Sequence, residues 1–145
     1  MSKLAVTPEE YVEILNLYSA YNLASDEGDA EGYANCFLEN GEHHGTYDIY
    51  GRAALIEYKK ADKAKRTNVY RRHWNGSIHL EKVDDHTVIG RCYFLAYNGT
   101  PGKLPAIADS GVYKDRLVKE GGKWKFAHRH LTLDAPSAAV AQTPR

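Results

Sequence analysis

Apolar residues in the first quarter of the chain recur with the spacing of an α-helix. Thr7 and Glu10 form a capping box with Pro8 at the first helical position, so a helix is predicted from there to about residue 25. Continued by one turn, its apolar stripe reaches Asp26, which puts a carboxylate at the last core-facing position. The residues predicted to form the stripe before it are Tyr11, Leu15, Tyr18 and Asn22.

Two further helices are predicted before the pattern changes. Asp29 can cap the second after Gly28, and this helix should include residues 33, 36 and 37. Residues 39–42 have the composition of a turn, and a short extended segment is expected from His43 to Tyr50. The third helix, from Arg52 to about residue 63, is predicted to bury its apolar side chains and to expose its lysines. Those apolar side chains are Leu55, Ile56 and Tyr58.

After residue 66 the pattern becomes that of long strands. Strands are predicted over residues 72–83, 87–97, 107–119 and 124–133, with turns at 84–86 and 120–123. Helices followed by an antiparallel meander indicate an α+β fold. We expect one domain over residues 1–145, with a core at about 8–134 and a mobile tail at 135–145 that is rich in Ala and Pro.

Charge and cysteine content narrow the class of protein. Lys plus Arg and Asp plus Glu each number 19, so no overall field attracts nucleic acid or an anionic membrane. No apolar run reaches the length of a transmembrane helix, and residues 1–4 lack the features of a signal peptide. Cys36 and Cys92 show no disulfide or metal-binding spacing. A cytoplasmic protein that binds neither nucleic acid nor membrane is therefore expected.

Tyrosine dominates the aromatic residues: the chain has 11 Tyr, 3 Phe and 2 Trp. A tyrosine offers an apolar ring with a hydroxyl at its tip, which suits a cavity for an aromatic ligand. The alternative is that most of these rings lie in the core or on half-exposed strands. A small aromatic substrate is the partner that this composition favours.

Three segments carry a resemblance to a known family: residues 18–37, His73-Trp74 at the start of a strand, and residues 122–129. Together they resemble the SnoaL-like superfamily over about residues 8–134, and most of all its scytalone dehydratase and hexachlorocyclohexane dehydrochlorinase branch. The resemblance implies an NTF2-like fold, in which a strongly curved antiparallel or mixed sheet forms a cone-shaped barrel around the N-terminal helices. It also implies a homo-oligomer, dimer or trimer, and a catalytic pair formed by Asp26 and His73.

Two departures from the dehydratase pattern limit what the resemblance implies. Ser25 stands where that pattern has a tyrosine before the Asp, and residues 87–97 contain no second catalytic histidine. Substrate identity therefore does not transfer. Taken alone, Asp26 could be a helix-terminal cap and His73 an ordinary strand histidine.

The chemistry expected of the pair is acid/base catalysis without a cofactor. A neutral imidazole accepts a proton near pH 7, and a carboxylate on its other nitrogen fixes the tautomer. We therefore expect a lyase that eliminates water or releases an aldehyde from a small aromatic or cyclic substrate. An isomerase or polyketide cyclase on the same scaffold, and a non-enzymatic ligand-binding module, are the alternatives. No nucleotide, nucleophile or hydride-transfer motif is present.

Further side chains are candidates for substrate binding. His128 and His130 share one face of the last strand, but no third ligand stands at a recognisable spacing, so no metal site is predicted. Arg129 points the other way and is a candidate partner for a carboxylate. The predicted substrate-binding residues are Asn22, Tyr47, Tyr50, Arg72, Tyr93, Tyr97 and His128.

Overall fold

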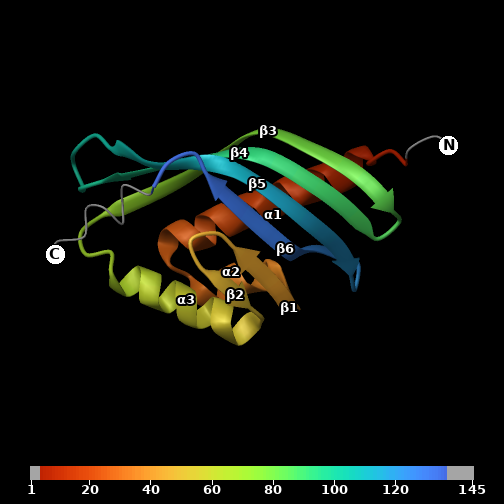
Figure 1. The fold of residues 1–145 in the computed structure, drawn as a ribbon, viewed down its shortest axis with the longest axis horizontal. Helices are drawn as coiled ribbons and strands as arrows, with labels where there is room; N and C mark the ends of the chain where they lie inside the picture. The colour runs from red at the N-terminus through yellow and green to blue at the C-terminus, as the bar shows by residue number, and fades with distance from the viewer. Residues whose placement is uncertain (1–3, 137–145) are drawn as a thin grey trace.

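Three helices and six strands make up the computed structural model, which describes residues 4–136. The strands form one sheet in the order β2-β1-β6-β5-β4-β3, in which only β1 and β6 run parallel. In chain order the elements are α1 (Pro8–Glu27), α2 (Ala30–Asn35), β1 (Phe37–His44), β2 (Asp48–Tyr50), α3 (Arg52–Ala64), β3 (Tyr70–Asp84), β4 (Thr87–Gly99), β5 (Ala106–Glu120) and β6 (Lys123–Leu133) (Figure 1).

The long first helix begins and ends as predicted, but it buries a different stripe. The Thr7–Glu10 capping box is present, and Gly28 ends α1 in the left-handed conformation with φ 72°. Tyr11 is exposed, whereas Ile14, Tyr18 and Tyr21 lie in the core. The predicted stripe is therefore rotated by part of a turn, because several apolar faces compete on a helix with so many tyrosines.

Three local predictions between residues 36 and 64 are wrong. The second helix does not include residues 36 and 37, because α2 ends at Asn35 and Phe37 already begins β1. Residues 39–42 do not form a turn but continue β1, whose pairing with β6 shifts register between Phe37 and Glu42. A β-bulge accommodates residues that have no partner in β6, so the strand continues through a segment whose composition is typical of a turn. The lysines of α3 do not all face outward, because Lys59 is only 4% exposed.

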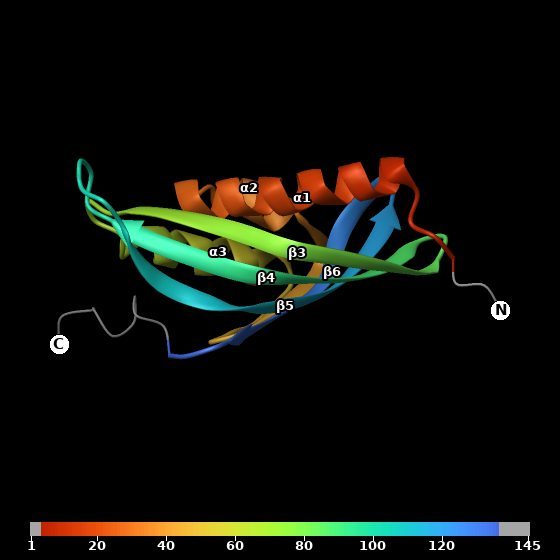
Figure 2. The same cartoon turned by 90° about the horizontal axis from the view of Figure 1, so that it is seen from above.

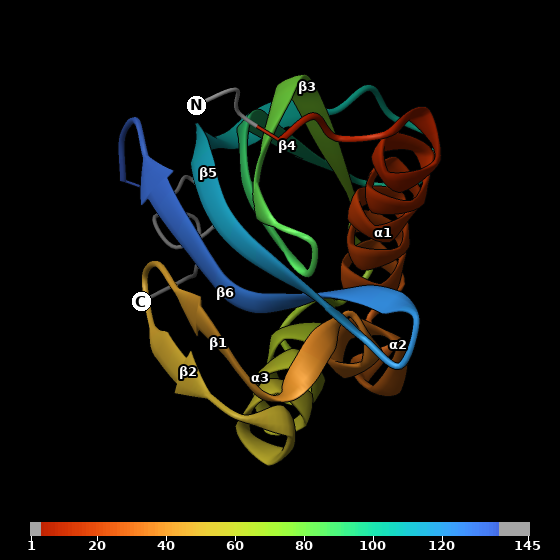
Figure 3. The ribbon, with the colours of Figure 1, turned by 90° about the vertical axis from the view of Figure 1, so that its right-hand side faces the viewer.

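The sheet is strongly curved and its inner face is covered by helices. Figure 2 shows α1 lying along the sheet, and Figure 3 shows the strands bending from β3 round to β2 with α2 and α3 at the open side. The predicted α+β class and mixed sheet are confirmed. The sheet is open and not a closed barrel, because its two edge strands, β2 and β3, do not pair with each other. Most of the tail predicted at 135–145 lies outside the described residues.

A buried ion pair surrounded by aromatic rings forms the centre of the core. Arg129 and Asp115 are both fully buried, with their side-chain atoms 3.2 Å apart, and the Tyr18 hydroxyl donates to Asp115 at 2.7 Å. The Arg129 guanidinium lies 3.5 Å from the ring centroid of Tyr113 and 4.2 Å from that of Tyr21. Three of the 11 tyrosines, Tyr18, Tyr21 and Tyr113, thus enclose a cation in the core.

Both cysteines are free and buried. Burial raises the pKa of each thiol, Cys36 and Cys92, to about 11, so both remain protonated at neutral pH. Within residues 4–136, no helix has the length and apolar character needed to cross a bilayer.

Candidate active site

The carboxylate of Asp26 is held at the C-terminal end of α1. The last carbonyls of a helix lack donors within the helix, and here Arg66 donates hydrogen bonds to two of these carbonyls. Its guanidinium donates to the backbone oxygen of Asp26 at 3.0 Å and to that of Ser25 at 2.9 Å. The same guanidinium lies 3.2 Å from Asp62 at the end of α3. Arg66 therefore fixes the position of the helix end that carries Asp26.

The strand β3 brings His73 onto Asp26. Successive side chains of a strand point to opposite faces, so His73 and Asn75 face the helices while Trp74 faces outward. The His73 ring nitrogen Nδ1 bonds Asp26 Oδ1, and the His73 backbone N–H donates to Asp26 Oδ2 at 3.1 Å. Their side chains are 7% and 8% exposed, respectively. Both carboxylate oxygens thus hold one histidine, 47 residues away in sequence.

The environment keeps the His73 imidazole neutral near pH 7. Burial lowers the pKa of His73, the bond to Asp26 acts in the opposite direction, and the charge on Arg71 lowers it again. The ring lies 5.3 Å from that of Phe94 on β4, centroid to centroid. With Nδ1 bonded to the carboxylate, Nε2 is the nitrogen that can accept a proton from another molecule.

Asn22 lies one turn before Asp26 and meets the same strand. Its Nδ2 donates to Asn75 Oδ1 at 2.8 Å, while its own Oδ1 is buried without a hydrogen-bond partner among the described residues. Asn75 stands two positions after His73 on the same face. Asn75 was not among the predicted site residues, although its place two residues after a candidate histidine on a strand was a usable signal.

A buried lysine lies beside the catalytic candidates and was also missed. Lys59 Nζ donates to Ser25 Oγ at 2.8 Å and to Asp62 Oδ2 at 3.1 Å. Burial lowers the pKa of Lys59, and the adjacent Asp62 carboxylate opposes that effect. Ser25, which replaces the tyrosine of the dehydratase pattern, therefore bonds a cation. No sequence signal separated Lys59 from its exposed neighbours, because only the packing of α3 onto α1 buries it.

Several residues predicted for substrate binding do not meet His73. Arg72 is exposed on the opposite face of β3, and Tyr97 pairs with it in register on that same outer face. Tyr93 is likewise exposed on the outer face of β4. Strand alternation explains these corrections, since residues next to an inward-facing position point outward.

The remaining predicted substrate-binding residues lie around β1 and β2. Tyr50 and His128 are placed on the outer face, each against His44, with ring centroids 5.3 and 4.6 Å from that ring. Tyr47 is exposed in the connection before β2, with its ring 6.2 Å from that of Tyr58 on α3. Of the predicted substrate-binding residues, Asn22 is the one that the structure places beside the Asp26–His73 pair.

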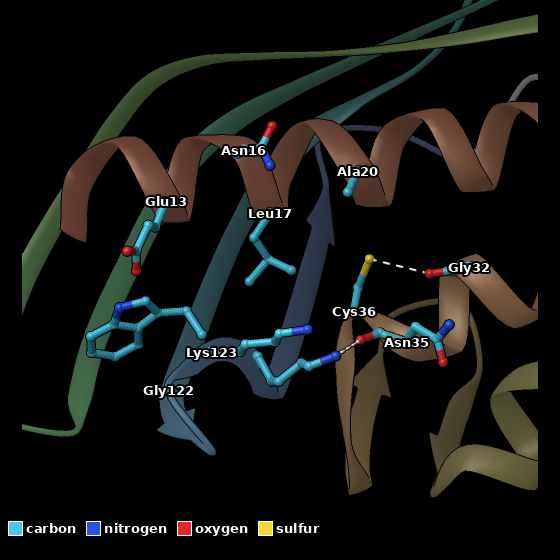
Figure 4. Close-up of a pocket in the computed structure, with 11 residues that line it drawn as sticks. Glu13, Asn16, Leu17, Ala20, Gly32, Asn35, Cys36, Gly122 and Lys123 are labelled. Carbon is cyan, nitrogen blue, oxygen red and sulfur yellow. Dashed lines mark hydrogen bonds between the residues drawn. The ribbon is translucent and has the colours of Figure 1, made fainter. Parts of the chain in front are cut away.

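A groove elsewhere on the molecule contains neither Asp26 nor His73. It has a volume of about 420 Å³ and lies between α1, α2 and the start of β6 (Figure 4). Cys36 lies at one end, with its thiol donating to the Gly32 carbonyl at 3.4 Å. None of the described residues that line this groove forms a hydrogen bond or ion pair with Asp26 or His73, so the groove is a separate feature of the surface.

Comparison with known proteins places this geometry in a family. A protein of unknown function from Mycobacterium tuberculosis is 31% identical, with a TM-score of 0.81 over 93% of this chain and 91% of that chain. Two proteins of Novosphingobium aromaticivorans share the fold. One is an NTF2-like protein with a cystatin-like fold, at 23% identity and TM-score 0.77 over 92% and 87% of the two chains. The other is a proposed scytalone dehydratase, at 24% identity and TM-score 0.75 over 88% and 85%.

None of the curated proteins compared with the chain matches it. The SnoaL-like domain, by contrast, matches residues 7–130. This range includes all three helices and the whole sheet except the last residues of β6. The predicted superfamily is thus confirmed, and the protein belongs to the SnoaL-like domain family.

Proposed function

We propose that this chain is a cofactor-independent lyase for a small aromatic or cyclic substrate, with His73 as general base and Asp26 as its positioning partner. The observation that carries the proposal is the double contact of Asp26 with His73, through ring Nδ1 and backbone N–H. A carboxylate in this position fixes the tautomer and stabilises the imidazolium that forms when Nε2 takes a proton. Membership of the SnoaL-like family supports an enzyme that processes a small molecule.

The reaction proposed is an elimination. His73 Nε2 removes a proton from a carbon next to an electron-withdrawing group, and the electron pair of that C–H bond forms the new double bond. The bond to the leaving hydroxyl breaks, and the imidazolium returns its proton so that water departs. In the aldehyde-releasing alternative, the base removes a hydroxyl proton and the electron pair of that O–H bond forms the aldehyde C=O. The carbon–carbon bond then breaks, and the carbon that keeps its electron pair takes the proton back from the imidazolium.

The proposed substrate class follows from the groups that surround the histidine. The Phe94 ring lies 5.3 Å from the His73 ring, so the proposed base stands in an apolar, aromatic environment that favours an aromatic or cyclic substrate. The buried Oδ1 of Asn22 has no hydrogen-bond partner among residues 4–136, so it can accept a bond from a substrate hydroxyl.

The two buried free thiols are consistent with a reducing, cytoplasmic setting.

The experiment is a screen of hydroxylated aromatic and cyclic compounds, scored by loss of the mass of water or an aldehyde. Once a substrate is found, turnover is compared between the wild type and the variant His73→Gln. Glutamine keeps an N–H donor for Asp26 but cannot act as a base, so kcat should fall by about 10²–10⁴-fold. Asp26→Asn should also lower kcat, because the amide no longer fixes the tautomer.

The matched control is His79→Gln, which changes an exposed histidine on the same strand and should leave turnover unchanged. Thermal unfolding of each variant checks that the fold is retained. Unchanged turnover in His73→Gln would overturn the mechanism. A product with the mass of its substrate would instead indicate an isomerase or cyclase, and stoichiometric binding with no product would indicate a ligand-binding module.

A further inference from the structure

A second group of ionisable side chains lies on the outer face of the sheet, where β1 and β6 pair. Glu42 lies opposite His128 and His44 opposite His130 in this parallel pair, and Asp48 of β2 lies opposite His44. Alternate residues of a strand share a face, so these side chains gather on one surface. We call Glu42, His44 and His128 the outer histidine cluster.

The cluster lies on the face of the sheet that points away from the Asp26–His73 pair. Figure 3 shows β1 side by side with the later part of β6, away from α1. The residue between Glu42 and His44 is His43, which is buried on the inner face, so the cluster side chains are directed outward. Neither the helices nor the proposed base contributes to the cluster.

The donor atoms of the cluster are close enough to share one ion. One ligand atom from each of the three side chains lies within 4.8 Å of the others. His44 Nε2 and Glu42 Oε2 are 3.0 Å apart, and the rings of His44 and His128 stack with centroids 4.6 Å apart. Ligand atoms on a tetrahedral zinc ion are about 3.3 Å apart, given bond lengths of about 2.0–2.1 Å. Small side-chain rotations therefore suffice to close the site.

A carboxylate also orients the central histidine. Asp48 Oδ1 lies 2.8 Å from His44 Nδ1, so the Nδ1 proton is directed to Asp48 and Nε2 faces Glu42. Metal-bound histidines in proteins usually donate their second nitrogen to a carboxylate in this way, which fixes the ring and raises its basicity. The arrangement around His44 thus supplies both a ligand and the group that orients it.

We infer that the outer histidine cluster binds one divalent transition-metal ion of the zinc type through Glu42, His44 and His128. Two imidazoles and one carboxylate suit zinc, nickel or copper, whereas magnesium and calcium prefer oxygen ligands alone. His130 is the candidate fourth ligand, because its ring lies 6.3 Å from those of both His44 and His128. The proposed lyase chemistry does not involve this site.

The test is titration of untagged protein with Zn²⁺ by isothermal calorimetry, after dialysis against a chelator. Binding should saturate at one ion per chain. Co²⁺ should give the intense visible absorption bands of a low-symmetry site with nitrogen ligands. His44→Ala and His128→Ala should each weaken Zn²⁺ binding by at least about tenfold, and Asp48→Asn by about 10–100-fold, because its amide orients His44 less firmly.

Two variants serve as controls. His79→Ala removes an exposed histidine far from the cluster, and His73→Gln changes the proposed base, so both should bind Zn²⁺ as the wild type does. Loss of zinc binding in His130→Ala would identify the fourth ligand. Wild-type affinity in His128→Ala, or equal weakening in His79→Ala, would show only adventitious binding to surface histidines and would overturn the inference, whatever the outcome for turnover.

Discussion

At the scale of single residues, burial decides which histidines carry charge. His43 lies on the inner face of β1, where burial and the nearby charges of Arg129 and Lys59 lower its pKa to about 3. The Nδ1 atom of His43 has no hydrogen-bond partner among the described residues. The next residue, His44, points to the outer face and bonds the carboxylates of Glu42 and Asp48, so the same residue type serves different purposes on the two faces of one strand.

This burial makes the protein sensitive to acid. The unfolded chain protonates His43 near pH 6.5, whereas the folded chain does so only near pH 3. Between these values the unfolded state binds more protons, so the free energy of unfolding is fully retained above about pH 6.5 and falls as the pH is lowered. The loss from this one residue is about 2 kcal/mol at pH 5.

Urea unfolding of the variant His43→Gln at pH 7 and pH 5 measures how much His43 contributes to the pH dependence of the unfolding free energy. The difference in unfolding free energy between the two pH values should shrink by about 2 kcal/mol relative to the wild type. Any uniform destabilisation by the substitution cancels in that difference. His86→Gln, at an exposed turn, is the control and should keep the wild-type difference. An unchanged difference in His43→Gln would mean that His43 does not titrate as proposed.

At the scale of elements, the joint between α1 and α3 decides where Asp26 lies. No basic residue occupies the last turn of α1. Backbone N–H groups just after the helix bond two of its last carbonyls, and Arg66, which follows α3, adds bonds to the oxygens of Ser25 and Asp26. Lys59 of α3 adds a buried bond to Ser25 in the same turn. The third helix thus holds the end of the first through two cations.

Replacing Arg66 by Met should therefore affect both stability and catalysis. Three contacts of a largely buried guanidinium are lost, and a single hydrogen bond to a charged group contributes about 1.5–3 kcal/mol, so the unfolding free energy should fall by at least about 2 kcal/mol. The turnover found for the proposed reaction should also fall, since Asp26 is less firmly placed.

Lys60→Met is the matched control, because Lys60 is exposed and its contact with Glu57 is 3.7 Å long. Exposed ion pairs of this kind contribute about 0–1 kcal/mol. Urea unfolding and kcat for both variants make the comparison. If Arg66→Met matched Lys60→Met in both measurements, the proposed role of Arg66 at the helix end would be refuted.

At the scale of the whole molecule, the outer face of the sheet carries an exposed apolar patch. It lies over β3, β4 and the start of β5, whereas the outer histidine cluster lies on β1 and β6, beyond β5 in the sheet. Trp74 is 61% exposed and lies opposite Leu95 in the β3–β4 pair. Large exposed apolar patches mark interaction sites. The patch consists of Trp74, Tyr93, Leu95 and Ile107.

We expect two copies of the chain to associate through this patch. Sedimentation velocity over a range of concentrations should show a dimer or larger oligomer for the wild type, and Trp74→Ser should shift the population toward monomer because a large aromatic anchor is lost. Leu23→Ser, which changes an exposed apolar residue of α1, should have no such effect. A wild type that remains monomeric at high concentration would contradict this expectation.

The sequence by itself determined the order and type of most elements. The capping box at Thr7, the glycine after α1 and the alternation over β3 to β6 are local signals, and local propensity and periodicity act over a few residues. The Asp26–His73 pair was reached by resemblance, because no local rule joins residues 47 positions apart. The stripe of α1 and the path of β1 through residues 39–42 were not predicted, since packing and register selected among several acceptable patterns.

Only the tertiary structure decided what each polar side chain meets. Lys59 and Lys60 are neighbours in one helix, yet the packing of α3 buries the first and leaves the second in water. His128 and His130 lacked a third ligand in sequence, and the parallel pairing of β1 with β6 brings Glu42 and His44 to them. Periodicity fixes the face on which a residue lies, but the partner on that face is chosen by chain segments far away in sequence.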